Sequence, residues 1–255
     1  MSRYISIAEA RRAEGLRMAC LRRLPSPWTE AARGIFHVKG LPCQYAARRE
    51  DEPESAIADW AGDSSVPVVA WQGEKLRTGW AEILILAERL AAEPRLIPQD
   101  AEDRVTLFGL GHEICGEMGL GWCQRLLLLQ AALGHGPEGA LLPAARAAQL
   151  AGKYGFIPTH VRQAKGRVLD VLAMLDGRLR VQSFLVGEQL TAADIYWAVF
   201  ANTIRPLPAD MLPLAASVRA MFSQSDPDIL EAFSKRLQDH QQRVYRDYLE
   251  LPAPI

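Results

Sequence analysis

The apolar positions in the first ninety residues fall into short runs that alternate with segments of helical periodicity. Short apolar runs rich in β-branched residues are typical of buried strands, whereas apolar residues three and four apart indicate an amphipathic helix. On this basis the pattern predicts strands over 16–24, 41–47, 66–71 and 75–77. It predicts helices over 28–39, 53–61 and 78–90, which gives the order β-α-β-α-β-β-α.

Prolines and glycines mark the ends of several of these elements. Pro25-Ser26-Pro27 stops the first strand, and Pro27 suits the first turn of a helix because its missing N–H is not needed there. Gly40 fits the position just after that helix, and Gly62 closes the short one. Gln72-Gly73-Glu74 has the composition of a tight turn between two strands. Residues 1–15 appear peripheral, with a short polar helix around Ile7–Glu14.

The rest of the chain is predicted to be helical. A stretch with two prolines, Ala91–Asp100, is typical of a linker. The helical segments after it cover 101–133, 144–154, 159–175, 191–203, 212–223 and 229–249. Five glycines interrupt the first of them, and each costs about 1 kcal/mol relative to alanine in a helix. They indicate bends, a break, or backbone held close to a ligand or partner.

Composition and charge exclude several classes of function. The formal charge is −1 and about half of the residues are apolar, so we expect neither nucleic acid nor an anionic membrane surface as a partner. No run of about 18 apolar residues and no secretory signal occurs, so no membrane span is expected. The four cysteines form no C-x-x-C pair, which argues against a redox motif and a zinc knuckle. We expect no metal, and free thiols in a reducing cytoplasm.

Pro67 stands near the start of a predicted strand, where it cannot donate a ladder hydrogen bond. A trans proline at a sheet edge would explain it. A cis Val66–Pro67 bond would instead turn the backbone N–H and C=O of Val66 outward, where they could pair with an extended peptide.

Three stretches of the sequence resemble one family. The first is Val66-Pro67-Val68 followed by a hairpin and an amphipathic helix. The second is Ser26-Pro27-Trp28, with Arg33 and Lys39-Gly40-Leu41 at matching spacing, and the third is Phe184-Leu185-x-Gly-x-x-x-Thr-x-Ala-Asp-Ile195. In this order they are similar to the cytosolic glutathione transferase superfamily, of which the chain would be a divergent member. The resemblance implies an α/β thioredoxin-like domain followed by an all-α helical bundle domain.

We therefore divide the chain into four parts. They are an N-terminal extension (1–15), the thioredoxin-like domain (16–92), a linker (93–100) and the helical domain (101–255).

The resemblance also implies a glutathione site. Ser26 falls on the catalytic position, where a hydroxyl donates a hydrogen bond to the glutathione thiolate; its alternative role is to cap the helix that Pro27 begins. The residue before the cis proline, Val66, would pair with the cysteinyl backbone. Further glutathione-binding positions are Trp28, Pro67, Thr78 and Gly79. The family carries an acidic-Ser pair at the last two of these, and Glu82, one turn later, could supply the missing charge at a different spacing.

The helical domain contributes weaker candidates. The resemblance implies a pocket for a second substrate between the two domains, lined by His112, Cys115 and Trp122, each of which could equally be a core or interface residue. Thr191 and Asp194 form a capping box at the start of a helix, with Leu190 and Ile195 as a hydrophobic staple. The role of Thr191 and Asp194 is therefore structural.

The function implied is that of a glutathione transferase, with glutathione as co-substrate and an electrophilic small molecule as partner. Alternatives are a non-catalytic binding or scaffold protein of the same fold, and a glutathione-dependent isomerase, lyase or dehalogenase. The resemblance also implies a homodimer.

Overall fold

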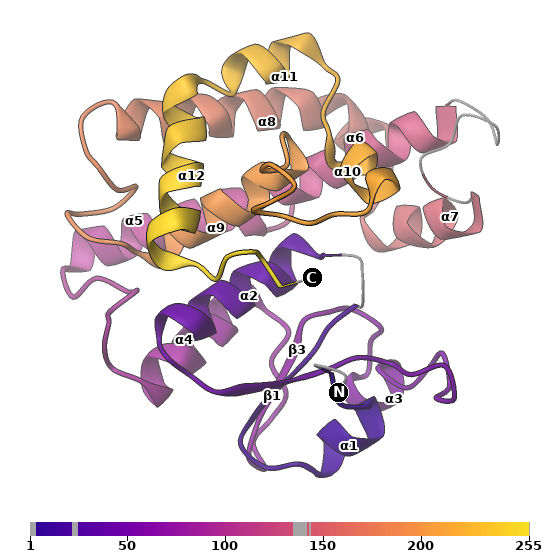
Figure 1. Cartoon of the computed structure of the whole chain (residues 1–255). Helices are drawn as coiled ribbons and strands as arrows, with labels where there is room; N and C mark the ends of the chain where they lie inside the picture. Colours follow the sequence, from indigo (N-terminus) through magenta and orange to yellow (C-terminus); the bar gives the residue numbers. More distant parts are fainter. Residues whose placement is uncertain (1–3, 22–24, 135–141, 143, 255) are drawn as a thin grey trace. The chain divides into compact units, whose positions relative to one another are not determined.

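The structure is a computed structural model that describes residues 4–21, 25–134, 142 and 144–254. The chain forms two compact units: the first consists of the residues up to Leu96 together with Pro254, and the second runs from Ile97 to Ala253 (Figure 1). The first holds a small mixed sheet with helices, and the second is helical, so the predicted fold class is confirmed. The domain limits proposed from the sequence stay a prediction.

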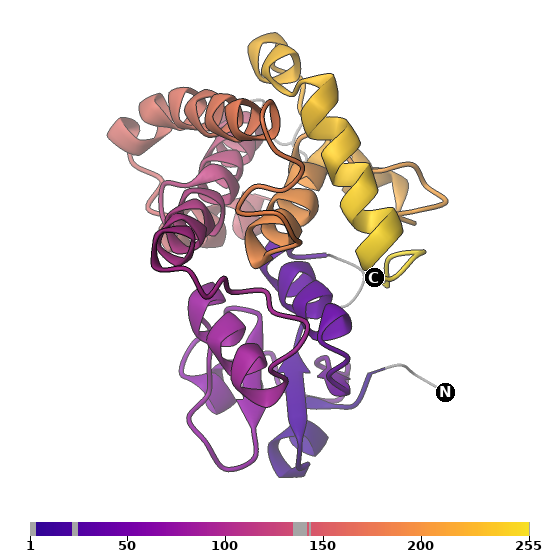
Figure 2. The ribbon, with the colours of Figure 1, turned by 90° about the vertical axis from the view of Figure 1, so that its left-hand side faces the viewer.

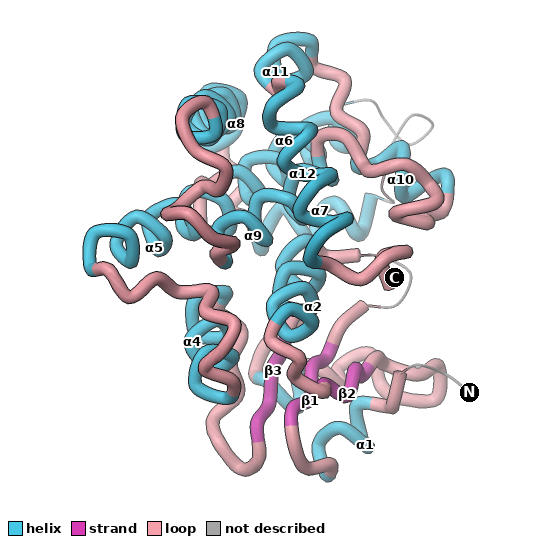
Figure 3. The backbone as a smooth tube through the Cα atoms, turned by 60° about the vertical axis from the view of Figure 1, so that its left-hand side comes forward, coloured by secondary structure: helices cyan, strands magenta, loops and turns pink. Residues whose placement is uncertain are grey.

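The sheet of the first unit has the order β2-β1-β3, with β1 (Leu16–Ala19) in the centre. β2 (Cys43–Ala46) and β3 (Val68–Trp71) lie on either side of β1 (Figure 3). β2 runs parallel to β1, and β3 runs antiparallel to it. The register places Ala19 between Ala46 and Val68. The strand predicted over 75–77 is reduced to one bridge between Val69 and Arg77.

Helices cover both faces of this sheet. α2 (Pro27–Val38) and α4 (Trp80–Leu90) contact each other, and Arg33 of α2 stacks on the ring of Tyr45, so this pair lies on the Tyr45 face. On the other face, α1 (Ile7–Arg12) and α3 (Ala58–Ala61) flank a cluster that includes Ala19, Ala46 and Val68. Because strand side chains alternate between faces, the sheet is buried on both sides.

The N-terminal segment is part of this unit, and its predicted peripheral position is wrong. Ile5 forms a bridge to the outer edge of β2, donating its N–H to the Tyr45 carbonyl and accepting from the Ala47 N–H, both at 3.0 Å. Ile7 and Ala10 of α1 are buried. The segment therefore covers an edge that would otherwise present unpaired backbone groups.

A buried charge pair joins α2, α4 and the segment that follows them. The Lys39 ammonium lies 2.6 Å from a Glu88 oxygen and donates to the Pro94 carbonyl at 2.7 Å, and its side chain is fully buried. The same Glu88 oxygen accepts the Leu96 N–H at 2.9 Å. Lys39 and Arg33 are both buried, because each has a partner carboxylate within reach, and Lys39 also has a backbone acceptor.

The described part of the second unit consists of helices and loops (Figure 2). Its elements are α5 (Ala101–Cys115), α6 (Leu120–Gly134), α7 (Ala144–Lys153), α8 (Pro158–Leu179), α9 (Ala192–Phe200), η1 (Ala201–Thr203), α10 (Ala216–Phe222), α11 (Pro227–Ala232) and α12 (Lys235–Tyr248). α6 packs on α8, and α9 packs on both α5 and α12. Across the described ranges, none of the helices combines the length and the apolar character that crossing a membrane requires.

Two predicted helices are each split in two. The segment 229–249 becomes α11 and α12 because the Ser234 hydroxyl accepts the Leu237 N–H and starts a new helix. The segment 101–133 breaks at Gly116–Gly119 into α5 and α6. A Cβ on Gly119 would lie 2.6 Å from the Glu113 carbonyl oxygen, so the glycine allows the two backbones to approach closely.

Gly119→Ala is expected to lower the free energy of unfolding by about 1–3 kcal/mol, because the backbone must shift to make room for the Cβ. The matched control is Gly109→Ala in the exposed middle of α5, where a Cβ meets nothing within 4 Å and helix propensity should raise that free energy by about 0.5–1 kcal/mol. Urea unfolding of the two variants measures both. Equal effects would contradict the account of the break.

Candidate functional site

The register of the sheet brings two chain segments to the same end of neighbouring strands. β1 ends at Ala19, directly opposite Val68, where the antiparallel β3 begins. The chain that leaves β1 continues to Ser26 and α2, and the chain that enters β3 carries Val66 and Pro67. The segment that leads to Ser26 therefore leaves the sheet at the same end at which the segment with Val66 and Pro67 enters it, although the two are forty residues apart in the sequence.

The Val66–Pro67 peptide bond is cis, which confirms the expectation drawn from the sequence. Within the described ranges, the backbone N–H and C=O of Val66 make no hydrogen bond. Its side chain packs against the apolar cluster under α1 and α3, so the residue itself is held in place. The result is a fixed, unpaired donor and acceptor of the kind that an added strand uses.

Ser26 is the N-cap residue of α2, with Pro27 directly after it. Its carbonyl accepts the Glu30 N–H at 2.9 Å, but its hydroxyl makes no capping hydrogen bond. The half-buried hydroxyl also has no partner elsewhere among the described residues. The Ser26 hydroxyl therefore does not cap α2, which was the alternative role considered from the sequence. Trp28, two residues on, is half-buried.

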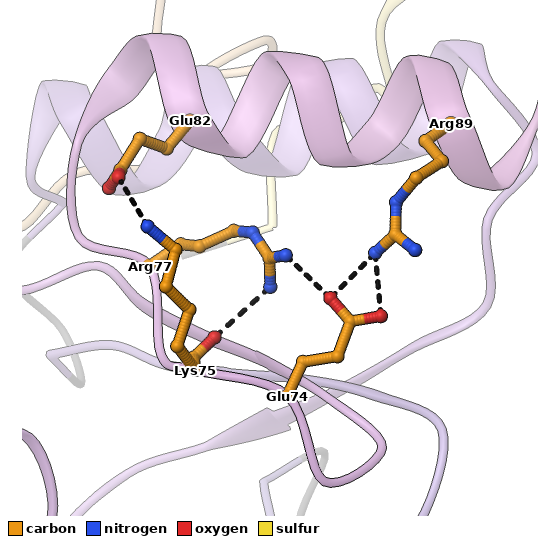
Figure 4. A network of polar contacts seen from close by, with 5 residues as sticks. All are labelled: Glu74, Lys75, Arg77, Glu82 and Arg89. Carbon is orange, nitrogen blue, oxygen red and sulfur yellow. Dashed lines mark hydrogen bonds and ion pairs between the residues drawn. The ribbon is translucent and has the colours of Figure 1, made fainter.

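The start of α4 holds the other two predicted glutathione contacts. Thr78 is exposed, and Gly79 is the N-cap residue, so it offers no capping side chain. Glu82 folds back over this end: one of its carboxylate oxygens would lie 3.3 Å from a Cβ on Gly79. The other oxygen is 3.3 Å from the Lys75 ammonium (Figure 4). The exposed Glu82 carboxylate and the exposed Lys75 ammonium therefore lie together near the start of α4.

Glu74 ties the turn before this site to α4. It accepts hydrogen bonds from Arg77 at 2.5 Å and from Arg89 of α4 at 2.7 Å (Figure 4). The hydrogen bonds from Arg89 and Arg77 lower the pKa of the Glu74 carboxyl below its usual value. Arg77 also donates to the Lys75 carbonyl at 3.1 Å, so the backbone that carries Lys75 is anchored to the network.

The three residues proposed for a second substrate have different surroundings. His112 is exposed on α5, whereas Cys115 is buried, and burial raises the pKa of its thiol. Trp122 donates its indole N–H to the Tyr154 carbonyl at 3.0 Å and packs edge-on against the Tyr154 ring. Their part in substrate binding stays a prediction. Across the described ranges, no group of three or more His, Cys, Asp or Glu side chains could hold a metal ion.

Asp194 is a structural centre of the second unit. Its fully buried carboxylate accepts the N–H and the hydroxyl of Thr191 and the N–H of Leu185, each at 2.8 Å. His240 of α12 contributes a fourth contact, with Nε2 at 3.0 Å. Sequence reasoning missed His240, because a single histidine forty-six residues away carries no local signal of this pairing.

This combination of a small mixed-sheet unit and a helical unit defines the glutathione transferase architecture. Residues 158–240 match the family described as "Glutathione S-transferase, C-terminal domain". The resemblance found in the sequence is thereby confirmed: residues 158–240 carry the C-terminal domain of the glutathione S-transferases, and the chain shares the fold of solved glutathione S-transferases.

Solved structures of the same fold come from several bacteria. A glutathione S-transferase domain-containing protein from Marinobacter aquaeolei is 14% identical, with a TM-score of 0.62 over 91% of this chain and 98% of that one. A glutathione S-transferase from Methylobacterium radiotolerans, in complex with glutathione sulfonate, is 16% identical, with a TM-score of 0.57 over 94% and 97%. A beta-etherase from Sphingobium sp. is 18% identical, with a TM-score of 0.52 over 86% and 98%. No curated protein matches the sequence.

Asp194→Ala should destabilise the protein more than Thr191→Ala. Removing the hydroxyl costs about 0.5–2 kcal/mol of cap stability. Removing the carboxylate leaves several buried donors without an acceptor, and each such donor costs about 1–3 kcal/mol. The free energy of unfolding should therefore fall by at least about 2 kcal/mol more than in Thr191→Ala. Denaturant unfolding followed by circular dichroism compares the two. Equal losses would show that Asp194 serves only the cap.

Proposed function

We propose that the first unit binds glutathione at the end of the sheet where β1 ends and β3 begins. We further propose that Ser26 activates the glutathione thiol for attack on an electrophilic small molecule. One observation carries the proposal. The unpartnered hydroxyl of Ser26 lies at the N-terminus of the helix that follows β1, and the unpaired backbone groups of Val66 come just before β3, whose first residue lies opposite the last residue of β1. The structure from Methylobacterium radiotolerans, of the same fold, holds glutathione sulfonate, which supports a ligand of this class.

The chemistry requires a thiolate near neutral pH. A free thiol has a pKa of about 8.5, so the protein must stabilise the sulfur anion with a hydrogen-bond donor and a positive environment. The Ser26 hydroxyl is the donor, and the N-terminal end of α2 supplies partial positive charge from its backbone N–H groups. The cysteinyl backbone pairs with Val66 as an added strand, which fixes the sulfur opposite Ser26. Trp28 and Pro67 contribute to the same proposed glutathione site.

The γ-glutamyl end carries both an ammonium and a carboxylate. Lys75 and Glu82, 3.3 Å apart beside Thr78 and Gly79, offer one charge of each sign to such a head group. Glu82 takes the part of the acid that the acidic-Ser pair would have provided, and the Thr78 hydroxyl takes the part of the serine. Arg77 holds the Lys75 backbone, while the Lys75 and Glu82 side chains are exposed and accessible to a ligand.

The second substrate and the assembly stay at the level of proposals. We propose that His112, Cys115 and Trp122 contribute to the electrophile's binding and that two copies form a homodimer. A non-catalytic binding protein is the second candidate, because Thr78-Gly79 replaces the acidic-Ser pair of the family. Glutathione-dependent isomerase, lyase or dehalogenase chemistry would use the same thiolate and would differ in the electrophile.

Calorimetric titration with glutathione should show binding at millimolar affinity or better to the wild-type protein. Ser26→Ala should still bind, since Val66 and the α4 end are unchanged, but the pKa of the bound thiol should be higher than in the wild-type complex. The thiolate's ultraviolet absorbance measures that pKa. Absence of binding at about ten millimolar glutathione would leave the non-catalytic protein as the better account.

Glu82→Gln should weaken glutathione binding about tenfold, because an ammonium loses its charged partner. The same substitution should leave unchanged the binding of a glutathione analogue that lacks the γ-glutamyl amino group. Glu74→Gln is the matched control, since it removes the same charge from the same network away from the helix start. Equal weakening by both variants would indicate a general electrostatic effect and contradict the role given to Glu82.

A further inference from the structure

A second hydroxyl without a partner lies one helical turn behind Ser26. Thr29 is three residues further along α2, and residues at this spacing are neighbours on the helix surface. Helical side chains lean toward the N-terminus, which is the direction of the turn that carries Ser26. Thr29 is only 1% exposed, and its Oγ1 has no hydrogen-bond partner in the described part of the chain.

This arrangement is unusual for a buried threonine. In a helix the hydroxyl ordinarily donates to the carbonyl three or four residues earlier, which satisfies it locally. Here those carbonyls belong to Ser26 and Pro25, and Thr29 bonds to neither. A buried hydroxyl left without a partner is unfavourable, and valine has the same shape without that cost. Packing alone therefore does not explain why this position is a threonine.

We propose that Thr29 is a positioning residue for Ser26, an inference that rests on the function proposed above. When glutathione binds, the Ser26 O–H turns to donate to the sulfur anion, and a lone pair of its oxygen becomes available to the Thr29 O–H. Hydrogen bonds in such a chain polarise one another, so the Ser26 hydroxyl becomes a stronger donor. The thiol proton leaves to solvent, and neither hydroxyl loses its own proton.

The test uses the full-length protein and glutathione, with the ultraviolet absorbance of the bound thiolate as the readout. Thr29→Val preserves the side-chain shape and removes the hydroxyl; it should reduce the thiolate-to-thiol ratio at a given pH about fivefold. Thr29→Ser should restore it. In the absence of glutathione, Thr29→Val should be at least as stable as the wild type, because it removes an unsatisfied hydroxyl. A purely structural role would not move the thiol pKa.

A double-mutant cycle makes the test specific. In a Ser26→Ala background, Thr29→Val should leave the thiol pKa unchanged, since the hydroxyl chain is already broken. If Thr29→Val does not fold, Thr29→Ala replaces it in the same cycle. A wild-type protein whose bound thiol is acidified through Ser26, with no effect of Thr29→Val, would overturn the role of Thr29 and leave the proposed function intact. A wild-type protein that binds no glutathione would overturn both.

Discussion

The antiparallel pairing of β1 with β3 is the constraint on which the candidate site depends. Because Ala19 lies opposite Val68, the chain leaves β1 and enters β3 at the same end of the sheet. The chain that leaves β1 leads to the N-terminus of α2, where a serine has a hydroxyl that is not used for capping. A shift of the register by one residue would turn every side chain of β3 to the opposite face and separate these elements. The chemistry proposed for Ser26 and Val66 therefore follows from strand register first and from residue identity second.

Buried polar groups fix each unit around this frame. In the first unit, Lys39 and Glu88 hold the C-terminal end of α2 against α4 and the segment at Pro94. In the second, Asp194 gathers backbone donors together with His240. Removing one member of such a set is costly because the remaining charge or donor stays buried without its partner. The Lys39–Glu88 pair lies at the C-terminal ends of α2 and α4, whereas the glutathione contacts are proposed at their N-terminal ends, so this pair supports the fold rather than the reaction.

Much of the fold could be predicted from local pattern, and the exceptions have physical causes. The order of the main elements and the cap at Thr191 each depend on a few adjacent residues, so the sequence was sufficient. The residues around Pro67 left both peptide isomers open, and the cis bond was expected only from the family resemblance. The N-terminal segment was predicted to be peripheral because its helix is short and polar, yet Ile5 finds the open edge of β2 through backbone bonds that leave no mark in composition. For the same reason Lys39 and His240 could not be assigned: their partners, Glu88 and Asp194, are distant in the chain.

The central claim is that the thiol of glutathione lies at the end of the sheet where β1 ends and β3 begins. A crystal structure of the protein grown with glutathione tests this most directly. The account predicts the sulfur within hydrogen-bond distance of the Ser26 hydroxyl and the cysteinyl backbone paired with the N–H and C=O of Val66. Glutathione bound elsewhere, or a sulfur that faces away from α2, would contradict it.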